Sequence, residues 1–301
     1  MSASAMAAEP PLVCEVGPGH ERDPVPRADG DITTTLLVSR GTMSGGANIA
    51  SCLSAHGGVH CLTREDLITK VNTYGELATR VAAVISRADR DYKQFSDLRR
   101  PYLIFMRRAL LQYTRAGRLA YFGYSGHLLL PRLAHLVRVR LIAPLEVRVS
   151  RTCRVLGMRE AEARDHIRST DTERLQWARM MYGVDLRDPA GYDLCVNLER
   201  WTQRGACELL VSIFEQAEFQ PTPESVAQLE NERLVTEVLA ALVAHPETRE
   251  LEMQAVAAYG AVRLVGPFLP ADKLRIVQDI AGAVTGVKDV QYEPGYRTAL
   301  P

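Results

Sequence analysis

The chain has 301 residues and carries equal numbers of basic and acidic side chains, 36 of each, so its formal charge is zero. This balance argues against a bulk polyanion such as nucleic acid as a partner, because such partners select a strongly basic face. No run approaches the ~18–20 apolar residues that span a bilayer, so we expect no integral membrane segment. Residues 1–30 lack the apolar core of a signal peptide, and we expect a disordered arm on a cytoplasmic protein.

Six cysteines are scattered along the chain, and no two of them form a CxxC pair. Zinc clusters and redox dithiols depend on such close pairs. The sequence therefore predicts reduced, structural thiols and no metal site made of protein side chains.

Short apolar runs alternate with helical patterns through the first two thirds of the chain. The predicted strands are residues 33–39, 59–62, 119–122, 136–143 and 193–197. The predicted helices begin near residue 47 and cover residues 64–87, 101–114 and 144–181. Strands that alternate with helices indicate βαβ crossovers, so we expect an α/β fold with a parallel sheet flanked by helices.

A second, smaller unit is predicted at the C-terminus. Residues 220–228 contain two prolines and neighbour a stretch with little apolar pattern, and we interpret them as a linker. Beyond it the pattern predicts a helix, two strands, a helix and a strand, at residues 229–244, 250–257, 261–265, 271–284 and 287–292. Residues 229–301 should thus form a small α+β domain of α-β-β-α-β order.

A glycine-rich loop at residues 41–46 lies between the first predicted strand and the first predicted helix. Its candidate phosphate-binding residues are Gly41, Ser44, Gly45 and Gly46. Such a loop directs backbone N–H groups and the positive end of a helix dipole at an anion. A tight glycine turn that only packs strand against helix is the alternative interpretation.

The predicted helical segment 144–181 is unusually cationic, with seven arginines between Arg148 and Arg174. Arg168, Asp171 and Arg174 are spaced three apart, so on a helix they share one side and the carboxylate can hold a guanidinium in place. An exposed helix covered with salt bridges would show the same pattern.

Four stretches together resemble the cytidylate-kinase-like family of P-loop proteins. They are LLVSRGTMSGGANIA (36–50), AYFGYSGHLLL (120–130), VRLIAPLEVRVSR (139–151) and RSTDTERLQWARMMYGVDLRDPAGYDLCVN (168–197). The resemblance implies a P-loop kinase-like domain over residues 31–219 that binds ATP with Mg²⁺ and transfers phosphate to a nucleoside monophosphate. It also implies a lid whose catalytic residues are Arg148, Arg151, Arg168, Asp171 and Arg174.

The sequence departs from the family's pattern at three positions. Ala47 and Asn48 stand where a P-loop has Lys and Ser or Thr, Tyr124 stands where an arginine would bind the acceptor phosphate, and Thr63 replaces an acidic residue. Each change removes a charge or a ligand that would orient phosphate or metal. The alternative function is therefore that of a catalytically impaired pseudokinase.

The C-terminal unit resembles a BON domain. The matching residues are 260–266, GAVRLVG, and 286–290, GVKDV, on either side of a predicted helix. The resemblance implies binding of a small ligand, a lipid or another protein. In the pseudokinase hypothesis this domain is the interaction module.

Overall fold

The computed structural model describes residues 32–86, 97–115 and 117–295. The expected disordered arm, residues 1–30, lies outside the described residues. Among the described residues, no helix combines the length and the apolar character needed to cross a bilayer. Two compact units are present: the described residues of Met1–Leu67 with Tyr113–Pro221, and those of Ile68–Gln112 with Thr222–Pro301.

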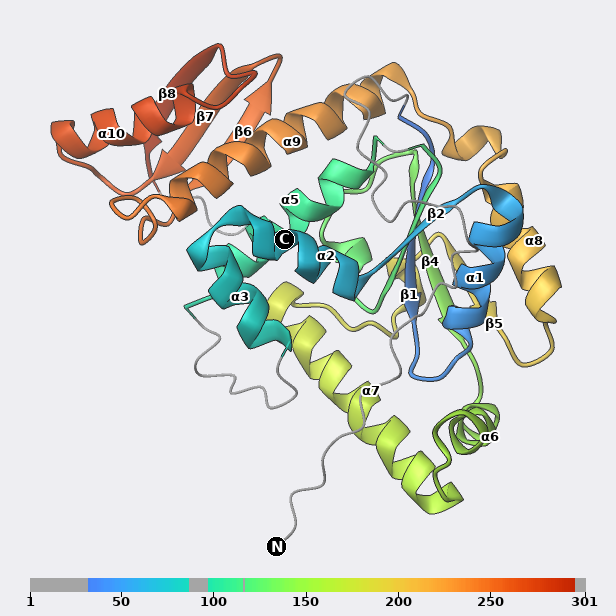
Figure 1. The fold of residues 1–301 in the computed structure, drawn as a ribbon. Helices are drawn as coiled ribbons and strands as arrows, with labels where there is room; N and C mark the ends of the chain where they lie inside the picture. Colours follow the sequence, from blue (N-terminus) through green and yellow to red (C-terminus); the bar gives the residue numbers. More distant parts are fainter. Residues whose placement is uncertain (1–31, 87–96, 116, 296–301) are drawn as a thin grey trace, which may run out of the picture. The chain divides into compact units, whose positions relative to one another are not determined.

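The first unit is built on a parallel five-stranded sheet of order β2-β3-β1-β4-β5 (Figure 1). Its strands are β1 (Thr35–Arg40), β2 (His60–Thr63), β3 (Leu119–Gly123), β4 (Leu136–Ile142) and β5 (Leu194–Asn197). At the centre, Val38 pairs with Phe122 on one side and Val139 on the other. The central strands are buried on both faces, as in covered parallel sheets. The predicted α/β fold is thus confirmed.

Helices α1 (Gly46–Gly57) and α8 (Gln203–Ile213) lie side by side against the sheet (Figure 1). One hydrophobic core joins them to the strands and includes Leu53, Phe122 and Leu210. Two further helices, α6 (Leu145–Leu156) and α7 (Glu160–Tyr182), form a helical hairpin around the apolar contact of Val149 with Ala163 and Ile167. The single long helix predicted over residues 144–181 is therefore two helices. The break falls at Gly157, whose backbone is left-handed and ends α6.

A disulfide joins Cys52 on α1 to Cys207 on α8, with the two Cα atoms 6.1 Å apart. The expectation of reduced thiols is wrong for this pair. Both sulfurs lie in the core between the helices, far apart in sequence, where no spacing motif marks them.

The second unit contains helices from two separate parts of the chain. Its elements are the C-terminal end of α2 (Arg64–Val71), η1 (Asn72–Tyr74), α3 (Glu76–Ser86), α5 (Arg99–Tyr113), α9 (Pro223–Ala244), β6 (Gln254–Ala258), β7 (Ala261–Gly266), α10 (Ala271–Gly282) and β8 (Asp289–Pro294). The predicted helix over residues 64–87 is interrupted at Gly75, whose φ of 105° is left-handed. The α-β-β-α-β order of the C-terminal part is confirmed.

The three C-terminal strands form a separate sheet of order β6-β7-β8. Val262 and Leu264 alternate on β7 and pack with Val238 of α9 and Val277 of α10. The expected linker differs from the structure: residues 223–228 begin α9, because Thr222 caps the helix and proline is tolerated in a first turn. Pro223 therefore starts a helix instead of breaking one.

Three arginines of α5 bind the C-terminal segment within the second unit. Arg107 pairs with Glu232 at 2.6 Å and Arg108 with Glu237 at 2.8 Å, both on α9. Half-buried Arg100 donates to the backbone carbonyl oxygens of Leu251 and Met253. Burial lowers the pKa of Arg100, and these carbonyl oxygens replace part of the water that its guanidinium has lost.

His127 is a buried titratable group in the first unit, in η2 (Gly126–Leu128), and it is 3% exposed. Its ring lies 4.8 Å from that of Tyr192. Burial, followed by the nearby charges of Arg138 and Arg140, lowers the pKa of His127 from 6.5 to about 3. The side chain is therefore neutral in the folded protein at neutral pH.

We predict that ending the chain at residue 219 destabilises what remains, since Arg100, Arg107 and Arg108 all lose their partners. The fragment should aggregate or melt well below the full chain, whereas Arg204→Ala, which removes an exposed ion pair of α8, should change the melting temperature little. Thermal unfolding followed by circular dichroism measures both. A 1–219 fragment that melts like the full chain would contradict this account of the second unit.

A second prediction concerns acid stability. The unfolded chain takes up a proton at His127 below about pH 6.5 whereas the folded chain does so only near pH 3, so this residue lowers the free energy of unfolding as pH falls between those values. The slope contributed is at most about 1.4 kcal/mol per pH unit. In urea unfolding between pH 7 and pH 4, the free energy of unfolding should fall less steeply for His127→Gln than for the wild type. Equal slopes would mean that His127 is protonated in the fold.

Candidate functional site

A cavity of about 200 Å³ opens at the carboxyl edge of the parallel sheet. Ligands of open α/β sheets bind at this edge, where the strand ends and the following loops meet. Its walls come from the ends of β1 and β4, from α6 and α7, and from the segments after β3 and α7. The lining residues are Arg40, Gly41, Tyr124, Arg140, Ile142, Ala143, Arg148, Asp171, Arg174, Leu175, Leu186 and Arg187.

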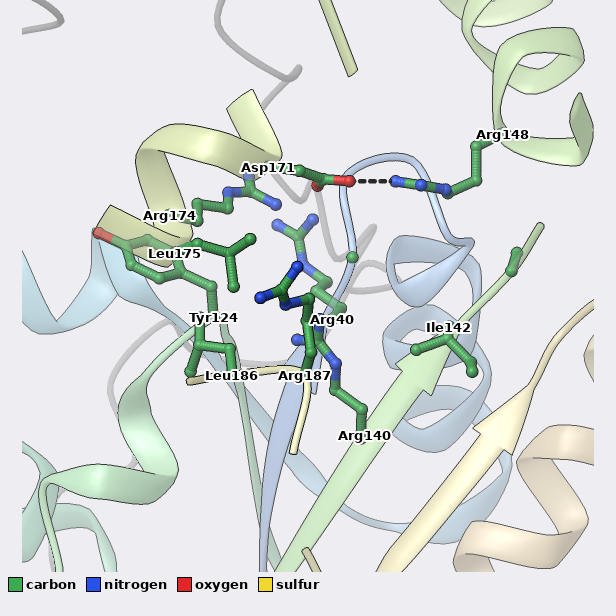
Figure 2. A pocket seen from close by; sticks show the side chains of 12 residues that line it. Arg40, Tyr124, Arg140, Ile142, Arg148, Asp171, Arg174, Leu175, Leu186 and Arg187 are labelled. Atoms are coloured by element: carbon green, nitrogen blue, oxygen red, sulfur yellow. Dashed lines mark hydrogen bonds and ion pairs between the residues drawn. The ribbon is translucent and has the colours of Figure 1, made fainter. Parts of the chain in front are cut away.

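The lining contains five guanidinium groups and a single carboxylate. The guanidinium groups of Arg40, Arg174 and Arg187 converge on one space (Figure 2). Burial, with a smaller contribution from Arg174, lowers the pKa of the Arg140 guanidinium, while Tyr192 and Asp171 act the other way. Like charges gathered in a partly dry site repel one another, and an anion placed among them would reduce that repulsion.

The carboxylate of Asp171 binds the glycine loop to the two helices of the hairpin. It accepts from the Thr42 hydroxyl at 2.6 Å and from the Thr42 backbone N–H at 3.2 Å, while its other oxygen accepts from Arg148 at 2.5 Å (Figure 2). The Thr42 hydroxyl also accepts from Arg174 at 3.1 Å. Charge-assisted hydrogen bonds of this kind are stronger than neutral ones, so Asp171 fixes where both arginines stand.

The loop itself depends on glycine at its end. Gly45 has a φ of 106°, a left-handed conformation that lets the chain turn into α1. Arg151 donates to the Ser44 carbonyl oxygen and, at 3.0 Å, to that of Leu198 after β5. Arg151 thus ties the loop to the neighbouring strand end and does not line the cavity.

Tyr124 occupies the position where the family resemblance implies an arginine for the acceptor phosphate. It is 7% exposed. The guanidinium carbons of Arg174 and Arg64 lie 5.4 Å and 5.8 Å from its ring centroid. Cations over an aromatic face are attracted at these distances, so Tyr124 helps to position Arg174.

The structure brings together most of the site residues predicted from the sequence. Arg148, Asp171, Arg174 and Gly41 line the cavity, and Arg151 contacts the loop at Ser44. Arg168 is exposed on α7 and lies outside the cavity lining. Gly45 and Gly46 shape the turn into α1. The chemical roles of these residues stay predictions.

Sequence reasoning missed three cavity arginines: Arg40, Arg140 and Arg187. Arg40 and Arg140 stand near the carboxyl ends of neighbouring parallel strands, and Arg140 donates to the Ser39 hydroxyl at 2.7 Å. A charged residue inside an apolar strand is the signal that could have identified Arg140. Arg187 sits in an irregular segment and is bound by Asp185, so no pattern marked it.

Thr63, which stands where the family has an acidic residue near β2, is hydrogen-bonded to the carboxylate of Asp66. The Thr63 backbone N–H and hydroxyl both donate to the Asp66 carboxylate at 2.7 Å, and the Asp66 N–H donates back at 3.2 Å. This reciprocal pattern is a capping arrangement at the start of α2. The carboxylate is thus engaged in holding a helix end.

The residues present suit phosphate groups but do not form a Mg²⁺ site of protein side chains. Within the described ranges, no three His, Cys, Asp or Glu side chains are grouped to hold a metal ion. Asn48 replaces the P-loop hydroxyl that would bind Mg²⁺ and is exposed, while Asp171 is engaged by Thr42 and Arg148. The arginines and the loop, by contrast, match the charge of a phosphate chain.

Comparisons with known proteins give the following likenesses. A curated cytidylate kinase from Methanopyrus kandleri is 39% identical over 90 residues, which are 29% of this chain and 46% of that protein, so the match spans under half of the relative. An uncharacterized protein from Eubacterium ventriosum aligns at a TM-score of 0.47 and 14% identity, over 61% of this chain and 99% of that one. Shikimate kinase from Acinetobacter baumannii aligns at 0.37 and 13% identity, over 60% and 92%.

The model of the cytidylate kinase-like family matches residues 36–200, more than half of the chain. The matched range contains the parallel sheet except for Thr35, the glycine loop and every residue that lines the arginine cavity. The resemblance stated from the sequence is confirmed for this part. The chain belongs to the cytidylate kinase-like family.

Proposed function

We propose that the protein binds the phosphate groups of a nucleotide in the arginine cavity and transfers a phosphoryl group from ATP to a nucleoside monophosphate. The observation that carries this proposal is the convergence of guanidinium groups beside a glycine loop at the carboxyl edge of the sheet. Membership of the family supports the reaction class.

The size of the cavity fits the phosphates but not a whole nucleotide. Ligand pockets for molecules of that size usually hold about 300–1,000 Å³, whereas this cavity holds about 200 Å³. The sugar and base are therefore proposed to lie outside it. The cavity would serve the reacting, charged end of the substrate.

In the proposed reaction, the bond between the γ-phosphorus of ATP and its bridging oxygen breaks, and a bond forms to an acceptor phosphate oxygen, so ADP leaves. Arg148 and Arg174 would bind the oxygens on which negative charge is spread during transfer. Asp171 would hold both arginines in position through its bonds to Arg148 and Thr42. Fixed cations aimed at developing charge need no reorganisation during the reaction.

A second candidate function is nucleotide binding without turnover, and specific residues favour it. Ala47 carries no charge where the P-loop lysine would act, and Tyr124 stacks on an arginine instead of supplying one. Loss of one such electrostatic group commonly costs on the order of 10²–10³ in rate. In this proposal the BON-like C-terminal segment would carry the working interaction, with a small ligand or a protein.

Turnover separates the two candidates. Calorimetry with ATP and with CMP should give binding in the millimolar range or tighter. A coupled assay for ADP formation with both nucleotides and Mg²⁺ should then show CMP-dependent turnover if the protein is a kinase. Binding without CMP-dependent ADP formation would select the pseudokinase, and no binding at all would contradict both.

We predict that Arg174→Ala weakens ATP binding about ten- to one-hundred-fold, because a hydrogen bond to a charged group contributes about 1.5–3 kcal/mol. Arg204→Ala is the matched control: it removes the same charge from exposed α8, where Arg204 pairs with Glu208. Its ATP affinity should equal that of the wild type. An equal loss of ATP affinity in both variants would show that the effect comes from the overall charge of the protein and not from Arg174.

A further inference from the structure

The glycine loop lacks a cation at the position where phosphate-binding loops carry one. In such loops a lysine after the last glycine reaches the β- and γ-phosphates. Here that residue is Ala47, which is exposed at the start of α1. A loop of backbone N–H groups alone would bind a phosphate chain more weakly.

Arg40 approaches the same loop from the other direction. It is the last residue of β1 and directly precedes Gly41. Its side chain runs across Gly46: a Cβ atom built on Gly46 would lie 2.6 Å from Cδ of Arg40 and 3.5 Å and 3.6 Å from its Cβ and Cγ. Glycine at residue 46 therefore provides the space through which the Arg40 side chain passes.

The charged end of Arg40 lies in the cavity. Its guanidinium group turns toward those of Arg174 and Arg187 (Figure 2). The side chain thus runs along the loop at residue 46 and ends in the space proposed for phosphate. Arginine suits this position because its planar group can make two parallel hydrogen bonds to phosphate oxygens.

We propose that Arg40 supplies the phosphate-binding charge that the loop lacks at residue 47, reaching the nucleotide from the strand that precedes the loop instead of from the helix that follows it. This inference rests on the proposed nucleotide binding and assigns the cation. In this proposal Gly46 has two roles: it belongs to the turn into α1, and it leaves space for the side chain of Arg40. A side chain at residue 46 would displace the one at residue 40.

The test compares ATP affinities by calorimetry, with inorganic tripolyphosphate as a second probe. Arg40→Met keeps an aliphatic chain across Gly46 but removes the charge, and it should weaken both ligands about ten- to one-hundred-fold. Adding Ala47→Lys to Arg40→Met should restore most of the lost affinity. Arg263→Ala, a surface arginine of β7, controls for net charge and should bind as the wild type does.

A double-mutant cycle tests the contact with Gly46. Gly46→Ala should weaken ATP binding in the wild type by more than it does in the Arg40→Met background, because only the wild type has the charge to displace. Thermal melts show whether each variant is folded, and Arg40→Lys, which keeps the charge, should retain most of the affinity even if Arg40→Met is unstable.

The outcomes separate this inference from the proposed function. A wild type that binds ATP, with an Arg40→Met variant that is folded and binds equally well, overturns the role of Arg40 and leaves nucleotide binding in place. An Arg40→Lys variant as weak as Arg40→Met would likewise contradict a role based on charge. A wild type that binds neither probe overturns the proposed function and this inference with it.

Discussion

The position of one carboxylate organises the candidate site. Asp171 on α7 accepts hydrogen bonds from Thr42 of the loop and from Arg148 of α6, so three segments meet at one group. Without this carboxylate, the guanidinium groups of Arg148 and Arg174 would lose the group that holds them beside the glycine loop. With it, Arg148 is held directly and Arg174 is held through the Thr42 hydroxyl.

The parallel sheet explains why these groups can meet at all. Because β3, β1 and β4 run in the same direction, their carboxyl ends share one edge. At this edge Arg40 ends β1, Tyr124 follows β3 and Arg140 lies near the end of β4. The Cys52–Cys207 disulfide and the core around Leu53 hold α1 against α8. The loop between β1 and α1 is therefore fixed at both of its ends.

The strands of the sheet could be predicted from the sequence nearly to the residue, because each is a short apolar run between turn residues. Helix breaks could not, since polar helices such as α6 and α7 continue the same pattern across Gly157. The linker was wrongly predicted at residues 220–228 because Pro223 was interpreted as a helix breaker. A proline can also be the first residue of a helix, and here Thr222 caps the helix that begins at Pro223. The pairing of Cys52 with Cys207 follows only from the packing of distant helices.

Within the site, the residues that belong to one continuous sequence motif could be predicted. The residues that become neighbours only through the pairing of distant strands could not. The loop glycines and the Arg148, Asp171 and Arg174 group belong to recognisable stretches. Arg40 and Arg140 become neighbours only when β1 pairs with β4, and each looks like an isolated charge in the sequence. The positive cavity is therefore a property of the fold.

The central claim is that a nucleotide's phosphates bind between the glycine loop and α7. Hydrogen–deuterium exchange with and without saturating ATP tests it most directly, because the ligand would contact backbone N–H groups of the loop and the arginines of the hairpin. The account predicts slower exchange in residues 41–46 and in residues 144–181, with little change in residues 254–294. Unchanged exchange in both of the first two segments at millimolar ATP would contradict it.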